Sequence, residues 1–409
     1  MAVATAVLFG GLLIYSEASG WSGWPGRWMS FAAAVRMSLF VLAPAAVLFG
    51  AWQGGRERRR RLDDQLASAA RPSWRPLVAT WAALTLGFWA GLFVVVAAGM
   101  ALVAPIATYW PPGWWAVVAV AFVGIAAMSA VGVALGRMVP SRLVGPTAAV
   151  VCYAAMIYAI DDSGQLRGVE WLAPVLSTDD APGHVISGSM SLRQTLWFIG
   201  LAAAALAVVG ARRKWLALVP AAAAAGAAWA LVAGPHGIWQ QDSAAAEMVC
   251  TDDAPTVCLI KQDAYLMDDV VVQVQEALAK FEGIAHGPDR AVQAAWFADE
   301  RPAPGDLVVE LDGGPTLTGG LAQPDWSQLL HWTVGNDCAQ PVDEDVGLAE
   351  IVDLWLNDST MPWHSPEVVA AYESLRAIPE AEQRDWISRY LEAAGTCDPA
   401  LVELLDELT

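Results

Sequence analysis

The chain has 409 residues, of which 56% are hydrophobic and only 16% charged, and it contains 21 tryptophans. This composition excludes ordinary soluble and disordered chains and is typical of a protein with several membrane spans. The formal net charge of -19 is unevenly spread, since residues 1–240 hold 16 Lys and Arg against 9 Asp and Glu, whereas residues 241–409 hold 7 against 33. We therefore predict a transmembrane domain over 1–240 and an acidic α+β domain over 241–409.

Seven apolar windows in the first domain approach or exceed the roughly 20 residues that a helix needs to cross a bilayer. They cover residues 3–15, 31–52, 77–106, 114–138, 143–160, 192–209 and 215–233. Glu17 ends the first window early, and no basic start or Ala-x-Ala cleavage site accompanies it, so we expect a retained span and not a removed signal peptide. The predicted fold class is an α-helical polytopic membrane protein with about seven transmembrane helices, followed by a small α+β domain.

The positions of Lys and Arg predict the orientation, because basic loops stay on the cytoplasmic side. Alternate connections carry basic clusters over residues 56–61, 137–142 and 212–214, and the connections between them are uncharged or acidic. The densest cluster consists of Arg56, Arg58, Arg59, Arg60 and Arg61. The seventh span therefore leaves the C-terminal domain outside the cell membrane.

Four of the five cysteines fall in the C-terminal domain, and an even number there suits an oxidising compartment. They are Cys250, Cys258, Cys338 and Cys397. The residues between Cys250 and Cys258 include Asp, Ala-Pro and Thr, which can reverse the chain, so we favour pairing of these two and of Cys338 with Cys397. Four reduced thiols or a metal site are the alternatives, although the spacings are not those of a zinc knuckle.

The connection between the second and third windows is basic and then amphipathic, and it reads GGRERRRRLDDQLASAARPSWRPL. Leu62, Gln65, Leu66 and Ala69 recur at helical spacing. Asp63 and Asp64 lie near the start of this segment, where the helix dipole favours carboxylates. The pattern predicts a short helix on the cytoplasmic surface, unless the arginines serve only to set the topology.

This loop resembles that of the membrane subunits of type-two ABC exporters, as does the order of six spans with the sixth ending at residues 212–214. The residues at matching places are Asp64, Gln65, Leu66 and Ser68, and with Asp63 they form the predicted coupling helix. The resemblance covers about the first 214 residues. It implies that this helix docks on a separate cytoplasmic ATPase subunit, which holds ATP and Mg²⁺, and that two permeases assemble with two ATPases. The seventh span and the outer domain are departures from that family.

Sequence motifs give no sign of catalysis in this chain. No G-x-x-x-x-G-K-[ST] phosphate loop occurs, so ATP hydrolysis is assigned to the partner chain and no cofactor to this one. The C-terminal domain contains His286, His331 and His364 but no H-E-x-x-H, G-x-S-x-G or S-x-x-K motif. We expect these histidines to be structural or exposed, and we expect neither catalytic residues nor a metal site.

Periodicity in the C-terminal domain predicts a helix over residues 264–281, strands at AVQAAWFA and DLVVEL, and helices from Trp326 onwards. The last part includes DWSQLLHWTV as a packed helix, a helix capped by Ser365 with Pro366 at its first position, and a final helix that stops at Gly395. In the membrane, Arg36 lies near enough to the outer end of its span for us to expect its side chain to reach the interface.

Together these observations predict an exporter permease for a hydrophobic or amphipathic substrate such as a drug, lipid or peptide. The alternatives are a membrane-anchored extracytoplasmic enzyme and a ligand-binding sensor or immunity protein. A neighbouring ATPase gene would favour the exporter. A bound metal or a reactive serine would favour the enzyme. We expect no nucleic-acid partner. The acidity of the outer domain either serves solubility or repels anionic polymers and attracts cationic peptides.

Overall fold

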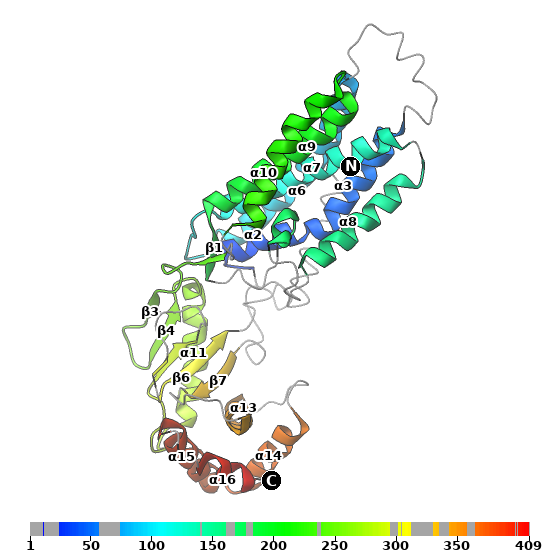
Figure 1. Cartoon of the computed structure of the whole chain (residues 1–409). Helices are drawn as coiled ribbons and strands as arrows, with labels where there is room; N and C mark the ends of the chain where they lie inside the picture. The colour runs from blue at the N-terminus through cyan, green and yellow to red at the C-terminus, as the bar shows by residue number, and fades with distance from the viewer. Residues whose placement is uncertain are drawn as a thin grey trace. The chain divides into compact units, whose positions relative to one another are not determined.

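The computed structural model describes two compact units, one formed by Met1–Ile106 with Trp110–Gln241 and the other by Ala107–Tyr109 with Asp242–Thr409. The first is a helical bundle, and the second is a sheet with helices packed on it (Figure 1). The described residues are Gly11, 24–56, 74–139, 141–160, 168–176, 183–234, 239–294, 302–303, 305–311, 330–334, 343–357, 365–396, 398 and 400–408.

Five segments of the helical unit are long and apolar enough to cross a membrane. They are Trp28–Gly54, Trp74–Val103, Trp114–Met138, Gly188–Gly210 and Lys214–Val232. Their helices are α2 (Trp28–Met37), α3 (Leu39–Gly54), α6 (Trp74–Val103), α7 (Trp114–Met138), α9 (Gly188–Gly210) and α10 (Leu218–Val232), with the short 3-10 helix η2 (Lys214–Ala217) before α10. A further apolar helix, α8 (Val144–Ile160), has 17 residues. The window at residues 3–15 lies outside the described part of the chain.

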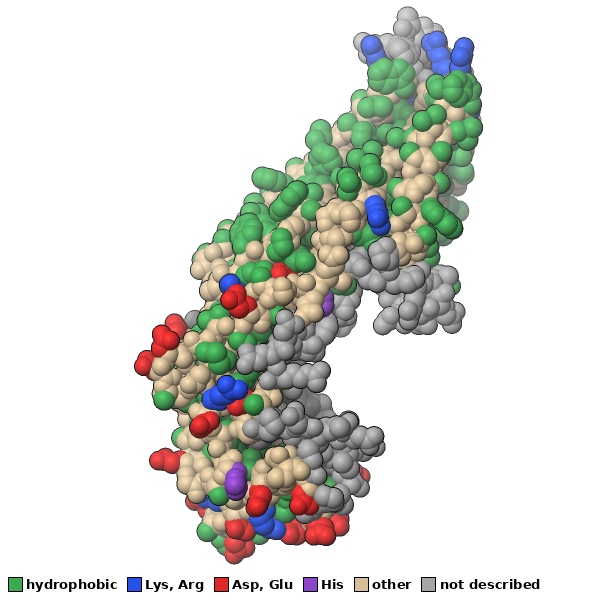
Figure 2. Space-filling view, turned by 60° about the vertical axis from the view of Figure 1, so that its left-hand side comes forward, with side chains coloured by type: hydrophobic (Ala, Val, Ile, Leu, Met, Phe, Trp, Pro, Cys, Tyr) green, Lys and Arg blue, Asp and Glu red, His purple; other side chains and the backbone are tan. Residues whose placement is uncertain are grey.

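Helix α7 is the centre of the bundle and packs against α2, α3, α6, α8 and α9. Most of its residues are buried, whereas only Ala224 and Leu231 are buried in α10. Large apolar side chains such as Phe93, Leu196 and Trp229 are exposed on the outer helices. Hydrophobic side chains accordingly cover much of the visible face of this unit (Figure 2). Such a surface is costly in water and suits a lipid environment.

The window predicted as one span over 31–52 contains two helices, α2 and α3, which meet at Ser38. The Ser38 hydroxyl donates a hydrogen bond to the Val35 carbonyl at 2.7 Å. A serine that bonds back onto the preceding turn competes with the regular helix ladder and bends the helix. The break at Ser38 comes two residues after Arg36, which lies in the last turn of α2.

Four glycines bring the backbones of α3 and α7 into direct contact. Gly50 and Gly54 lie on one face of α3, and Gly132 and Gly136 lie on one face of α7, since residues four apart share a helix face. A Cβ atom at Gly50 would lie 2.7 Å from the Ser129 carbonyl oxygen, and one at Gly136 would overlap the Ala51 carbonyl. Close packing of small residues is a principal way in which helices associate in a bilayer.

The second unit is built on a five-stranded sheet in the order β3-β4-β5-β6-β7. The strands are β3 (Met248–Cys250), β4 (Thr256–Ile260), β5 (Arg290–Gln293), β6 (Leu307–Leu311) and β7 (Leu330–Val334). The β4–β5 and β5–β6 pairs are parallel, while the β3–β4 and β6–β7 pairs are antiparallel. A parallel pair needs a crossover. Between β4 and β5 this connection contains α11 (Met267–Lys280), which confirms most of the helix predicted over 264–281.

The core of this unit lies between one face of the sheet and the helices. Val257 and Leu259 alternate on β4 toward this core, and Val270 and Val274 face it from α11 one turn apart. Helices α13 (Asp343–Asn357), α14 (Pro366–Ala377), α15 (Glu380–Thr396) and α16 (Ala400–Asp406) supply the rest. The Ser365 side chain caps α14 by accepting from the Val368 amide at 3.2 Å, as predicted.

Two expectations for this unit are corrected. The segment DWSQLLHWTV was predicted as a helix, but its last five residues form β7, paired with β6 in the register Val309 to Trp332. A short apolar segment can form either a helix or a strand. Here the edge of β6 is available for pairing, and this pairing favours the strand. The second correction is small: α15 continues one residue beyond the predicted stop at Gly395.

The predicted disulfide between Cys250 and Cys258 is confirmed. The two residues are direct neighbours across β3 and β4, and the chain reverses between them through Asp252, Asp253 and a cis Ala254–Pro255 bond. Thr251 stabilises this turn, since its hydroxyl accepts a hydrogen bond from the Val257 amide at 3.0 Å. Cys338 and Cys397 lie outside the described residues, so their pairing stays a prediction.

Candidate functional site

A polar centre inside the helical unit holds a short segment without α-helix, Gly168–Leu176, against the long apolar helices of the bundle. This segment, which we call the inserted loop, begins with the 3-10 helix η1 (Val169–Leu172). Three of its carbonyl groups accept hydrogen bonds from side chains of the bundle. Gln194 Nε2 donates to Trp171 at 3.1 Å, Trp197 Nε1 to Leu172 at 3.0 Å, and Arg36 Nε to Pro174 at 2.6 Å.

The inserted loop reaches far into the bundle. Val175 and Leu176 are buried, and a Cβ atom at Gly124 of α7 would lie 3.1 Å from the Pro174 side chain and 3.7 Å from that of Leu39. Gly124 is ten residues along α7, which corresponds to about 15 Å at the helical rise of roughly 1.5 Å per residue. Non-helical backbone at such a depth requires protein partners for its polar groups, and the three side chains supply them.

Arg36 is the charged member of this centre and is completely buried. Besides the bond to Pro174, its Nη1 donates to Gln194 Oε1 at 3.2 Å, while its Nη2 has no partner among the described residues. No ion pair joins Arg36 to a carboxylate in the described part of the chain. The expectation that Arg36 reaches the membrane interface is therefore wrong. The inserted loop covers its guanidinium and takes the hydrogen bonds that interfacial water would otherwise provide.

A buried guanidinium of this kind can do two things chemically. It fixes the inserted loop through its bond to the Pro174 carbonyl, while its bond to Gln194 Oε1 ties it to α9. Its unpartnered Nη2 can donate hydrogen bonds to an anionic or carbonyl group that reaches the bundle interior. Ionisable residues inside membrane spans are costly and commonly mark a functional site. Arg36, Gln194 and Trp197 together therefore form the candidate functional site.

Sequence reasoning identified Arg36 but missed Gln194, Trp197 and the inserted loop. A detectable signal was present, since Arg193 and Gln194 are polar residues near the start of an otherwise apolar window. The loop itself gave no such signal, because its sequence, GVEWLAPVL, is that of an ordinary connection. Only its depth in the bundle makes it part of a site.

Most of the residues assigned to the coupling helix and to the topology lie outside the described residues. These are Asp63, Asp64, Gln65, Leu66, Ser68, Arg58, Arg59, Arg60 and Arg61. Arg56 is described and exposed, two residues beyond the end of α3.

The three histidines do not form a site in the described part of the chain. His286 is exposed in a turn with a φ of 62°, β7 contains His331, and His364 lies outside the described residues. Within the described ranges, no group of three or more His, Cys, Asp or Glu side chains is arranged to hold a metal ion.

The interaction of Arg36 with the inserted loop can be tested by cysteine labelling. In Val175→Cys the thiol should resist a maleimide, because residue 175 is buried. Adding Arg36→Met should raise the labelling rate about tenfold or more, since a lost buried hydrogen bond costs roughly 1–3 kcal/mol. Labelling is quantified at residue 175 by peptide mass spectrometry, so the native cysteines do not interfere.

Arg193→Met is the matched control for this experiment. Arg193 is the neighbour of Gln194, but its Nη1 donates to the Ala230 carbonyl of α10 and not to the loop. Equal labelling of both double variants would show that Arg36 does not hold the loop. Removing the buried charge of Arg36 need not lower the overall stability of the protein. The labelling rate at residue 175, and not the melting temperature, is therefore the measurement that tests the interaction.

Comparisons of the chain with protein-family models, with curated proteins and with solved structures found no match.

Proposed function

We propose that the chain is the membrane subunit of an ATP-driven exporter that moves a hydrophobic or amphipathic substrate, such as a drug, lipid or peptide, out of the cell. The observation that carries this proposal is the connection between α3 and α6. It joins two membrane-length segments and combines a run of arginines with an amphipathic Leu62–Leu66–Ala69 pattern. The chain contains no phosphate-binding loop, so a separate ATPase supplies the energy.

In this proposal the bundle has seven spans: the five long segments, α8, and the apolar window at residues 3–15. The basic ends of α3, α7 and α9 face the cytoplasm, because positive loops stay inside. The second unit is then extracytoplasmic, which agrees with its disulfide between Cys250 and Cys258. Two such chains pair with two ATPases, as the resemblance of the loop implies.

The polar centre at Arg36 gives the proposed exporter a polar site in the interior of its helical bundle. A broken helix and an inserted loop near the middle of a bundle are features that transport proteins use at their binding sites. Arg36, Gln194 and Trp197 then hold the loop across the outward route. Release of the loop opens that route when the ATPase drives the bundle.

The decisive experiment measures the association of the chain with its ATPase. An ATPase should co-purify with the wild-type chain from gently solubilised membranes. Leu66→Asp places a charge at the predicted apolar anchor, and such anchors often contribute about 2 kcal/mol or more. We expect roughly 30-fold weaker association and a matching loss of substrate-stimulated ATP turnover.

Ala67→Asp is the matched control, because it adds the same charge at the next residue, away from the face that Leu62, Leu66 and Ala69 share. It should retain association and turnover. Normal association of Leu66→Asp, in protein that inserts correctly, would mean that the connection only sets the topology. Absence of any ATPase with the wild-type chain would overturn the exporter proposal itself and favour a membrane-anchored enzyme or a sensor.

A further inference from the structure

An open groove of about 570 Å³ lies at the basic end of the helical unit, where α6 begins and α9 ends. Its lining is apolar except for Arg212, and consists of Trp74, Leu77, Val78, Leu206, Ala207, Gly210, Ala211, Arg212 and Leu216. Gly210 shapes the groove, because a Cβ atom there would lie 2.8 Å from Leu77 Cδ2. The volume falls within the range of about 300–1,000 Å³ that is typical of sites for small ligands.

Arg212 lines this groove, and Arg75, Arg213 and Lys214 are sequence neighbours of its lining residues. Arg212 and Arg213 are exposed, and neither makes an ion pair with a described residue. Lys214 donates instead to the Val208 carbonyl at the end of α9, at 2.6 Å, and Arg75 lies 5.8 Å from the centre of the Trp74 ring. The described part of the helical unit contains a single carboxylate side chain, Glu170. It belongs to η1, which packs near the opposite end of α10.

The side chains beside the groove place it at the level of a membrane interface. Trp74 and Trp215 are each about half exposed, at 51% and 56%, and the exposed Leu218 and Val219 lie three and four residues after Trp215. Tryptophan is enriched where hydrocarbon meets the headgroups, and apolar residues beyond it contact acyl chains. An occupant of the groove therefore has an apolar part in the hydrocarbon layer and a charged part at the arginines.

We propose that this groove binds an anionic phospholipid from the leaflet at the basic end of the bundle. An acyl chain lies along Leu77, Val78 and Leu206, and the phosphate accepts hydrogen bonds from Arg212 and Arg213. Free phosphate would leave the apolar lining unused, and a zwitterionic lipid would bring its own cation to the arginines. Basic pockets between transmembrane helices recognise anionic headgroups in this way. The site does not depend on an ATPase or on the direction of transport.

The test uses the full chain in detergent, with native mass spectrometry during titration by phosphatidylglycerol or phosphatidylcholine of the same acyl composition. Phosphatidylglycerol should bind as one retained adduct at concentrations at which phosphatidylcholine does not. The double variant Arg212→Gln and Arg213→Gln should bind it roughly 30-fold more weakly, since each cation near a charged headgroup contributes about 1 kcal/mol. Ala207→Trp, which fills the groove, should also remove the adduct.

Arg56→Gln with Arg142→Gln is the matched control, because both arginines are exposed at ends of α3 and α8 and removing them changes the net charge equally. A similar loss in this control would show diffuse attraction to the protein surface and overturn the proposal, as would equal binding of phosphatidylcholine. A photo-crosslinking amino acid at Leu216 should capture phospholipid in native membranes. Capture there of residues 57–73 or of a partner chain would assign the groove to protein and also overturn the proposal.

Discussion

Replacing Gly132 with leucine is expected to prevent the helical unit from assembling. A Cβ atom at this position would overlap the Val47 carbonyl, and a Cβ atom at Gly50 of α3 would lie 2.7 Å from the Ser129 carbonyl oxygen of α7. The obstacle is backbone on both helices, so no change of side-chain rotamer relieves it. Overpacking ordinarily costs about 1–3 kcal/mol, and a leucine against a rigid helix backbone should exceed this range. We expect aggregation or rapid loss of the monodisperse peak in size-exclusion chromatography.

Gly226→Leu is the control for this substitution. Gly226 also lies in an apolar helix, α10, but nothing comes within 4 Å of a Cβ atom there. The variant should behave as the wild-type protein in chromatography and in thermal unfolding. If Gly132→Leu assembles and melts as Gly226→Leu does, the contact between α3 and α7 is not as close as the structure describes it.

Replacing Trp386 with alanine should have the largest effect in the second unit. Trp386 is buried between α15 and α16, stacks on Tyr390 with ring centroids 6.1 Å apart, and donates from Nε1 to the Leu404 carbonyl at 3.2 Å. Loss of a buried tryptophan typically costs about 3–5 kcal/mol, because a cavity remains. Pulse proteolysis of the full chain in urea should show cleavage within residues 242–409 at a much lower urea concentration.

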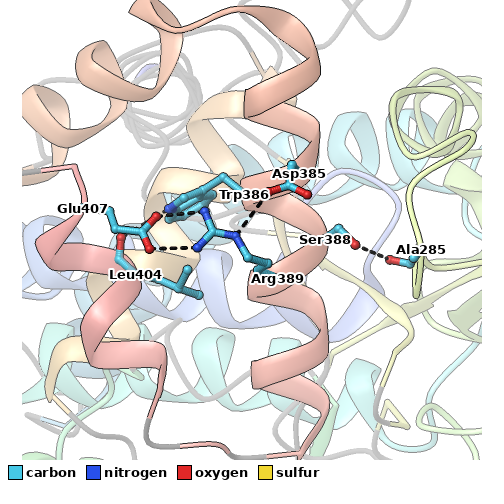
Figure 3. A network of polar contacts seen from close by, with 7 residues as sticks. All are labelled: Ala285, Asp385, Trp386, Ser388, Arg389, Leu404 and Glu407. Atoms are coloured by element: carbon cyan, nitrogen blue, oxygen red, sulfur yellow. Dashed lines mark hydrogen bonds and ion pairs between the residues drawn. The ribbon is translucent and has the colours of Figure 1, made fainter.

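Arg389→Ala supplies the comparison, because it acts between the same two helices. Arg389 of α15 forms two hydrogen bonds of 2.8 Å with Glu407, the residue directly after α16 (Figure 3). These bonds lower the pKa of the Glu407 carboxyl. Both side chains are nearly half exposed to solvent, so the pair should contribute at most about 1 kcal/mol. Equal destabilisation by the two variants would contradict the assignment of the buried ring as the principal contact.

The sequence by itself determined the features that depend on local composition. Windows of apolar residues identified the segments that form α6, α7, α9 and α10, because length and hydrophobicity alone decide whether a helix can cross a bilayer. The cap at Ser365 and the helix α11 followed from residue types a few positions apart. The disulfide was predictable for the same reason, since the turn that brings Cys250 to Cys258 lies between them.

Only the tertiary structure decided which distant segments meet. The sequence of β7 favoured a helix, but this segment forms a strand because it pairs with β6, which lies some twenty residues earlier in the chain. The sequence placed Arg36 at the membrane interface, but the inserted loop covers it, and Pro174 of that loop lies 138 residues farther along the chain. The pairs Gly50–Gly54 and Gly132–Gly136 are visible in the sequence, yet nothing there says that they face each other. A side chain's own neighbours fix its helix or turn, whereas its burial and its hydrogen-bond partners depend on which surfaces pack together.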